Sequence, residues 1–406
     1  MARHPTPQDA LTFLSERRGQ KTAPALGWGL WNLGFRPFYL LAALLAAVSV
    51  PLWVLQFSGW LAHPVFEAAS WHAHEMIFGY ALAIVIGFLL TASRNWTGRP
   101  TPTGKSLMAL AILWLLARVL PLSPWVWASL VVNVAVPWAT AWALWKVLSA
   151  VKNRRNYFFV GWLVIMGGLT AWLHLQRAGV LAASSGATLS TALDVILFIV
   201  AVMAGRVVPM FSNNGVPGLG ATRNTVVEQL ALGSVLLLAG LDALGVQGAG
   251  MAAVLFLTMV IHGVRWLLWK PWGTRRNALV WVLHAAYFWL PVHLALRAGA
   301  QLQWWMPGAA THALTMGLLG MLTLGMMTRT ALGHTGQPLR AGRAEESMYV
   351  LVMLAAAIRV SVPLLMPQHT LVAVQFAAVL WSVAFGVYLW RYTPLLTRPR
   401  ADGQPG

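Results

Sequence analysis

The chain has 406 residues, of which 58% are hydrophobic and only 9% are charged. Soluble domains carry about 25% charged residues, so this composition excludes an ordinary soluble protein and indicates a membrane protein. The absence of cysteine excludes disulfides, iron–sulfur clusters, thiolate-bound metals and covalently attached c-type haem. The formal net charge of +18 would suit a nucleic-acid partner, so the positions of the basic residues decide what that charge means.

The N-terminal region lacks the features of a signal peptide, because no apolar core precedes Arg36. We expect residues 1–35 to form a cytoplasmic segment that lies partly along the membrane interface, since Trp28, Trp31 and Phe35 recur at helical spacing. Residues 36–391 are expected to form a membrane domain. Residues 392–406 are expected to form a cytoplasmic tail, and its Arg-, Pro- and Gly-rich composition predicts disorder at the end of the chain.

Twelve apolar segments are each long enough to cross a membrane as a helix, which takes roughly 17–25 residues. They lie near residues 36–57, 72–93, 104–121, 124–147, 157–178, 188–211, 225–243, 248–269, 277–298, 308–331, 347–366 and 370–391. The sequence therefore predicts an all-α integral membrane protein with about twelve transmembrane helices.

The basic residues follow this arrangement of spans. With the N-terminus in the cytoplasm, 24 of the 28 Lys and Arg residues fall on the cytoplasmic side. The other four lie near the outer ends of odd-numbered spans: Arg118, Arg177, Arg297 and Arg359. A wrong number of spans would destroy this alternation. The charge is therefore explained by the positive-inside rule, which places both termini in the cytoplasm and excludes the nucleic-acid reading.

A weak internal repeat relates parts of the membrane domain. The second span reads HAHEM from His72 and exits through TGRP, and the tenth reads HALTM from His312 and exits through HTGQP. The sixth span ends in a polar FSNNGVPG segment, from Phe211 to Gly218, that we expect to be a turn. The spacing indicates three pseudo-repeats of four helices each.

The densest group of ionisable residues lies at the outer end of the second span. Burying an ionisable side chain in a bilayer costs free energy, so the presence of His72, His74 and Glu75 in this span needs an explanation. Helical periodicity predicts that His72 shares a face with Glu75, Met76 and Gly79, whereas His74 lies about 200° around the helix, on the face of Phe78. Either this turn is not helical, or the two imidazoles serve different centres. The alternative is that these residues only cap the helix at the water boundary.

A second outer histidine begins the tenth span. His312 has Met316 one turn below it on the same face, so the second and tenth spans each present an outer histidine, as a haem b with two axial imidazoles requires. Haem propionates need arginine partners at the water edge, and we expect Arg118 and Arg297 to serve. Arg177 and Arg359 lie at the same depth, and any of the four could simply extend to lipid headgroups.

Further histidines lie towards the cytoplasmic side. His284, in the ninth span, and His334, in the turn after the tenth, are candidate metal ligands, although a lone histidine on an apolar face is more often a core residue. With no cysteine present, histidine and methionine ligation suits copper. The chain contains no P-loop, no GxGxxG after a strand and no HExxH, so nucleotide and metalloprotease chemistry have no support.

At these residues the chain resembles the NnrS family of bacterial inner-membrane proteins. The resemblance is carried by NLGFRPFYLLAAL (32–44), WHAHEMIFGYALAIVIGFLLTASRNWTGRP (71–100), GRVVPMFSNNG (205–215), WVLHAAYFWLPV (281–292) and HALTMGLLGMLTLGMMTRTALGHTGQPL (312–339). It implies a twelve-span inner-membrane protein with haem and copper that acts against nitric oxide and nitrosative stress, often beside denitrification genes. The family-like positions are His72, His74, Glu75, His284, His312 and His334.

A looser similarity, in architecture alone, is to the catalytic subunit of haem–copper oxidases and nitric oxide reductases. That subunit also has three four-helix arcs with a haem between the second and tenth helices. The pair of adjacent histidines that it carries in the seventh helix is missing here, since residues 225–243 contain no histidine. We therefore expect a haem b- and copper-containing protein that binds or reacts with nitric oxide; whether it is an enzyme stays open. His72 or His74, together with His312, is expected to supply the axial haem ligands. The other histidine of the second span, Glu75 and the inner-side His284 and His334 are the candidates to hold copper. The alternatives are a secondary transporter of a small solute and a membrane scaffold.

Overall fold

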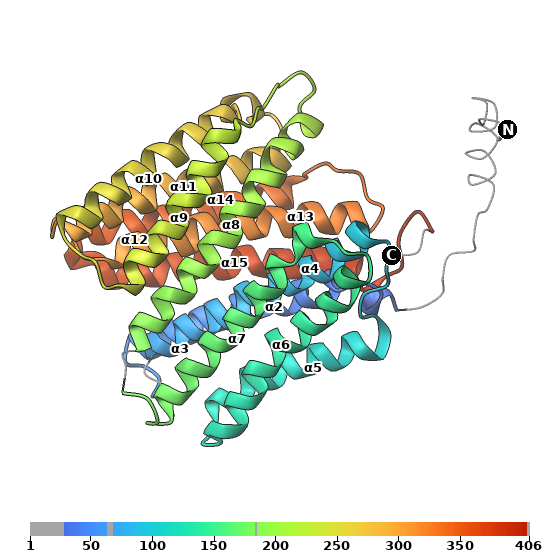
Figure 1. Cartoon of the computed structure of the whole chain (residues 1–406), viewed down its shortest axis with the longest axis horizontal. Helices are drawn as coiled ribbons and strands as arrows, with labels where there is room; N and C mark the ends of the chain where they lie inside the picture. Colours follow the sequence, from blue (N-terminus) through green and yellow to red (C-terminus); the bar gives the residue numbers. More distant parts are fainter. Residues whose placement is uncertain (1–27, 63–67, 183–184, 404–406) are drawn as a thin grey trace.

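The computed structural model describes residues 28–62, 68–182 and 185–403, and all secondary structure in these residues is helical (Figure 1). The spans of the first half are formed by α2 (Phe35–Phe57), α3 (Ala68–His74) with η2 (Glu75–Ala81) and α4 (Leu82–Thr97), α5 (Gly104–Val119), α6 (Val126–Ala150), α7 (Phe158–Arg177) and α8 (Ser185–Gly215). Helices suit a lipid bilayer, because a helix pairs its own backbone N–H and C=O groups in hydrogen bonds, and lipid chains offer no such partners.

The second half continues the same pattern. Its spans are α9 (Thr225–Ala243), α10 (Ala249–Leu268), α11 (Ala278–Gln301), α12 (Gly308–His312) with η6 (Ala313–Gly320) and α13 (Met321–His334), α14 (Arg343–Leu365) and α15 (Thr370–Thr397). Short 3-10 turns lie between or beside the spans: η1 (Gly29–Trp31), η3 (Leu120–Leu122), η4 (Arg154–Asn156), η5 (Pro271–Thr274) and η7 (Pro367–His369).

The prediction of twelve spans is confirmed, because twelve helices in the described residues are long and apolar enough to cross a membrane. The expected polar turn after the sixth span is partly wrong, since α8 continues to Gly215. Two side chains allow this extension. The Ser212 hydroxyl donates to the Val208 carbonyl, and Asn213 exchanges two hydrogen bonds with the backbone of Ala221, which ties the following loop to the helix end.

The C-terminal tail also differs from expectation. Helix α15 runs to Thr397, beyond the predicted end at residue 391, and the described part of the tail is tied to α13. The Arg400 guanidinium donates to the His334 carbonyl and the Ala401 amide donates to the Thr335 carbonyl. Arg400 also forms two hydrogen bonds with the Asp402 carboxylate, which raises the pKa of Arg400. These contacts replace the disorder predicted for this part of the tail.

The expected interfacial segment falls mostly on residues 1–27, which lie outside the described residues. Of its aromatic residues, Trp28 is exposed, Trp31 belongs to η1, and Phe35 begins α2 and is buried.

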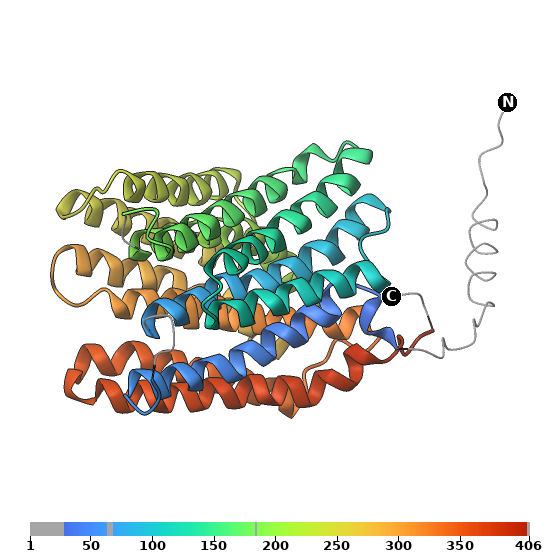
Figure 2. The same ribbon diagram turned by 90° about the horizontal axis from the view of Figure 1, so that it is seen from below.

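The first and last spans lie side by side, which closes the bundle. Figure 2 shows α15, in red, running along α2, in blue, and these helices are in contact. In the same view α9 and α10 lie on the opposite side of the bundle from α14 and α15. Helix α8 crosses the bundle obliquely in Figure 1 and contacts both α7 and α9.

The second and tenth spans form the interior. In their most apolar stretches 78% and 67% of residues are buried, against 17% for α9. Large apolar side chains cover the outside instead, including Trp127, Trp138 and Trp142 of α6. In a membrane these exposed apolar surfaces face lipid. The two most enclosed spans are the ones that carry His72 and His312.

Candidate functional site

A cavity of about 360 Å³ lies between the second and tenth spans at the end of the bundle where these two spans begin. We call it the histidine cavity, because His72 and His312 both line it. Its other walls come from α2, α8, α14 and α15, and they are almost entirely apolar. A volume of this size is typical of enclosed small-molecule and cofactor sites.

His72 is held against an aromatic ring. Its imidazole stacks on Trp53 of α2, with ring centroids 4.4 Å apart and 25° between the ring planes. Among the described residues, the buried Nδ1 of His72 has no hydrogen-bond partner. Met76 and Tyr80, one and two turns further along, line the same wall. The predicted shared face of His72 and Met76 is therefore confirmed, and the His72 ring keeps a nitrogen available to a ligand.

His312 is oriented by the backbone. Its Nδ1 lies 2.8 Å from the Gly308 carbonyl oxygen, which can only accept a hydrogen bond. Nδ1 therefore carries the proton, and Nε2 keeps its lone pair, as in metal-binding histidines whose other nitrogen donates to a carbonyl. Met316 lines the same cavity, which confirms the predicted shared face.

One arginine lines the histidine cavity, and it is Arg359 of α14. In the described residues no carboxylate forms an ion pair with it. Arg118 and Arg297, the two arginines expected to meet haem propionates, do not line this cavity. Arg118 donates to Glu75 and to Asn133, at 2.9 and 2.6 Å. Arg297 forms ion pairs with Asp242 and, at 3.7 Å, with Asp194.

Each of the two central spans contains a π-helical segment beside its histidine. η2 begins at Glu75, three residues after His72, and η6 begins at Ala313, directly after His312. A π-helical turn inserts an extra residue and rotates the following side chains, and such turns are frequent at functional sites. The matching position of the two segments supports the predicted correspondence between the second and tenth spans.

His74 belongs to a different cluster from His72. Its Nδ1 lies 2.9 Å from Oε1 of Glu75, and Oε2 of Glu75 accepts from Arg118. Glu75 therefore faces the side of His74, and the prediction that it shares a face with His72 is wrong. The π-helical turn that begins at Glu75 explains the difference, because 3.6-residue periodicity does not apply there. The predicted contact of His74 with Phe78 is confirmed, with ring centroids 5.5 Å apart.

Gly79 makes room for this cluster. A Cβ atom at this position would lie 2.5 Å from a side-chain carbon of Leu45 and 2.9 Å from a guanidinium nitrogen of Arg118, so a side chain here would crowd the arginine that binds Glu75. Gly79 therefore lies on the Arg118 side, and the prediction that it shares a face with His72 is wrong. The Gly79 carbonyl, in the middle of η2, also accepts a hydrogen bond from the Trp114 indole of α5 at 3.2 Å. The π-helical segment is thus anchored to α5 at the level of the ion pair.

The second partner of His74 is His174 of α7. Their ring centroids are 5.3 Å apart and their planes lie at 87°. His174 is 1% exposed, and neither of its ring nitrogens has a hydrogen-bond partner among the described residues. His174 is not among the predicted site residues, because nothing in the local sequence shows that α7 brings it to the second span.

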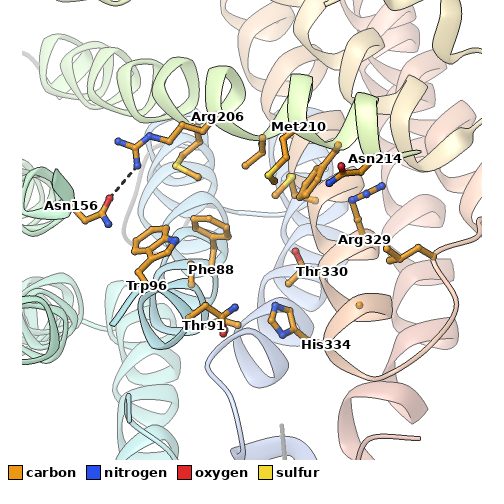
Figure 3. A pocket seen from close by; sticks show the side chains of 18 of the residues that line it. Phe88, Thr91, Trp96, Asn156, Arg206, Met210, Asn214, Arg329, Thr330 and His334 are labelled. Atoms are coloured by element: carbon orange, nitrogen blue, oxygen red, sulfur yellow. Dashed lines mark hydrogen bonds between the residues drawn. The ribbon is translucent and has the colours of Figure 1, made fainter. Parts of the chain in front are cut away.

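The two remaining candidate ligands lie elsewhere. His284 is buried in α11, and its Nε2 is 2.7 Å from the Ser212 hydroxyl. His334 lines a second, larger cavity at the other end of the bundle (Figure 3). Across residues 28–62, 68–182 and 185–403, no three His, Asp or Glu side chains form a group that could hold a metal ion by themselves. The predicted ligands therefore do not form one site. His72 and His312 share a cavity and His74 lies beside His174, whereas His284 and His334 each lie apart from the other candidates.

A family model for the NnrS protein matches residues 29–400, nearly the whole chain. The chain belongs to the NnrS family. The resemblance carried by the sequence motifs is thereby confirmed, and the membership fits a protein of the nitric oxide response. A search of the curated proteins finds no match to this NnrS-family chain.

The NnrS family is associated with haem and copper, and the residues present fit both groups. The histidine cavity of this NnrS-family protein combines two imidazoles from different spans, apolar walls and one arginine without a carboxylate partner in the described residues. These are the features that hold a flat, apolar dicarboxylate such as haem b. The His74–His174 pair offers two imidazoles with a carboxylate behind one of them, which is a donor set that suits copper.

Proposed function

We propose that this protein holds haem b in the histidine cavity, where His72 and His312 would bind its iron, and that it binds or reacts with nitric oxide. The observation that carries the proposal is the pair of imidazoles that two separate spans present to one apolar cavity. When bound, haem supplies an iron that exchanges single electrons and can bind diatomic gases. We place the protein in the bacterial inner membrane with both termini in the cytoplasm.

The residues around the cavity have separate tasks in this proposal. Gly308 fixes the tautomer of His312, and Trp53 fixes the plane of His72. Arg359 supplies the positive charge that a propionate needs, in place of Arg118 and Arg297. The apolar walls exclude water, which strengthens electrostatic interactions inside the site and admits an uncharged gas more readily than an ion.

We propose that copper is bound by His74 and His174. Glu75 accepts the Nδ1 proton of His74 and so leaves Nε2 as the coordinating nitrogen. The two ring centroids lie 5.3 Å apart, so the two imidazoles are close neighbours and could hold one ion between them. In this arrangement Arg118 balances the charge of Glu75 and is a positioning residue.

The cofactor proposal is tested on the purified protein in detergent. We expect a b-type haem signal in the reduced-minus-oxidised visible spectrum, and copper close to stoichiometric with protein in the same sample. A folded protein that is colourless and free of metal would contradict the proposal. It would favour the alternative function, a secondary transporter of a small solute.

The copper site is tested with His174→Ala and the matched control His369→Ala, an exposed histidine. We expect His174→Ala to lower bound copper at least tenfold, while haem content stays unchanged, because the two sites use different side chains. His369→Ala should change neither. Wild-type copper content in His174→Ala would remove this residue from the site.

A further inference from the structure

A second cavity lies at the end of the bundle opposite the histidine cavity. It encloses about 890 Å³ between α4, α8, α13 and the 3-10 turn η4 (Figure 3). We call it the arginine cavity, because four arginines line it: Arg155, Arg206, Arg223 and Arg329. No Asp or Glu side chain is among the described residues that line it.

Arg329 is the arginine that most requires an explanation. It is 8% exposed, and in the described residues no carboxylate or other acceptor receives a hydrogen bond from its guanidinium. Its guanidinium instead lies over the ring of Phe211, 4.1 Å from the centroid. An arginine that only follows the positive-inside rule would extend to water or headgroups. A mostly buried guanidinium that borders a cavity without a carboxylate among its described lining residues is available to bind an anion there.

The neighbouring arginines add to this positive charge. Arg206 donates to Asn156 at 3.1 Å and lies over the ring of Phe158, so a neutral amide and an aromatic face are its partners. Arg223 does reach a carboxylate, Glu228, at 3.3 Å, but Arg265 binds the same carboxylate more closely, at 2.7 Å. Positive charges gathered around one cavity repel each other, and an anion inside it would relieve that repulsion.

The remaining walls indicate the shape of the ligand. Aromatic rings and thioethers form a large part of the surface, including Phe88, Trp96, Met210 and Met326. Figure 3 shows Phe88 and Trp96 below Arg206, and Met210 between Arg206 and Asn214. A small ion, with a volume near the ~30 Å³ of a water molecule, would leave most of the 890 Å³ unfilled. The apolar walls therefore suit a ligand with a flat apolar body.

We propose that the arginine cavity binds an organic anion in which a phosphate or carboxylate group is joined to a flat aromatic body. Arg329 binds the charged group, since a guanidinium matches phosphate and carboxylate geometry with two parallel N–H groups, and Arg206, at the other end of the cavity in Figure 3, adds positive charge there. Trp96, Phe88 and the methionines contact the aromatic body. This site is separate from the histidine cavity and does not depend on which cofactor that cavity holds.

Riboflavin 5′-phosphate and riboflavin form a probe pair for this site, because they share one ring system and differ in the phosphate. Each is titrated into the purified full-length protein, and binding is read from quenching of flavin fluorescence against empty micelles. We expect riboflavin 5′-phosphate to bind at least tenfold more tightly than riboflavin. Arg329→Gln should remove that preference, and Arg99→Gln, an exposed arginine outside the cavity, should keep it.

The outcomes separate the parts of the proposal. Equal affinity for the two flavins, or no binding of either, would overturn it, as would an unchanged preference in Arg329→Gln. A further outcome is that inorganic phosphate displaces the bound flavin at the same concentration as riboflavin 5′-phosphate does. That result would show that the cavity does not recognise an aromatic body, and it would overturn that element of the proposal. Haem content is measured in the same variants and should be unchanged. Loss of haem in Arg329→Gln, with haem retained in His312→Ala, would place haem in this cavity and contradict the proposed function.

Discussion

At the level of single side chains, the orientation of His312 is set before any ligand arrives. The hydrogen bond from Nδ1 to the Gly308 carbonyl fixes both the tautomer and the direction of Nε2. The stacking of His72 on Trp53 restrains the other imidazole in a similar way. Side chains held like this lose little conformational entropy when a ligand binds, so the two rings are suited to hold a cofactor firmly.

The axial role of His312 is tested by His312→Ala. We expect bound haem to fall at least tenfold, because one of the two iron–nitrogen bonds is lost, whereas insertion into the membrane should be unaffected. Haem is measured per protein from the pyridine haemochrome, with membrane-fraction abundance as the measure of insertion. His369→Ala is the control, since this histidine is exposed and does not line the cavity. Full haem occupancy in His312→Ala would exclude it as a ligand.

At the level of elements, the shape of the histidine cavity depends on close packing between η6 and α15. A Cβ atom on Gly320, at the end of η6, would lie 2.5 Å from the ring of Trp381. Trp381 lines the cavity and cannot easily move, because its indole N–H donates to the Ala46 carbonyl of α2 at 3.1 Å. The absence of a side chain at Gly320 thus sets the position of one cavity wall.

Gly320→Ala is therefore expected to disturb both packing and haem binding. Overpacking of this kind costs about 1–3 kcal/mol, which should appear as a lower midpoint of thermal unfolding in detergent. We also expect reduced haem content, since Trp381 is displaced towards the cavity. Gly386→Ala is the matched control, because an added Cβ at this α15 position would meet no atom within 4 Å. If the two variants are equally stable and equally loaded, Gly320 has no role in the cavity wall.

At the level of the whole molecule, the two cavities lie at opposite ends of the bundle, and each has its own chemistry. The histidine cavity is apolar with one arginine, and the arginine cavity combines four arginines with aromatic and thioether walls. The basic residues that predict the cytoplasmic side gather at the end with the arginine cavity, including Arg155, Arg206 and Arg329. The histidine cavity should consequently open towards the periplasmic side.

Single-cysteine labelling tests this orientation, because the natural chain contains no cysteine. Gln368→Cys in η7 and Arg99→Cys after α4 introduce exposed thiols at the two ends. In intact cells we expect a membrane-impermeant maleimide to label Gln368→Cys and to label Arg99→Cys only after permeabilisation. The reverse pattern would invert the proposed topology.

The sequence by itself determined the membrane class, the twelve spans and the family. It did so because each of these depends on local properties: the length of an apolar segment, the alternation of basic residues and continuous motifs. His72 and His312 were also recognisable, since a charged or polar group in an apolar helix stands out by itself. Periodicity correctly placed Met76 and Met316 on the faces of these histidines.

Only the tertiary structure decided which side chains meet. His174 pairs with His74 because α7 packs near the second span, and no local pattern predicts that contact. Arg359 lines the histidine cavity, whereas Arg118 and Arg297 are bound by carboxylates that come from other spans, Glu75 and Asp242. The arginine cavity likewise draws its arginines from helices far apart in the chain. Hydropathy and periodicity describe one helix at a time, and the partners of a buried polar group are set by how separate helices pack.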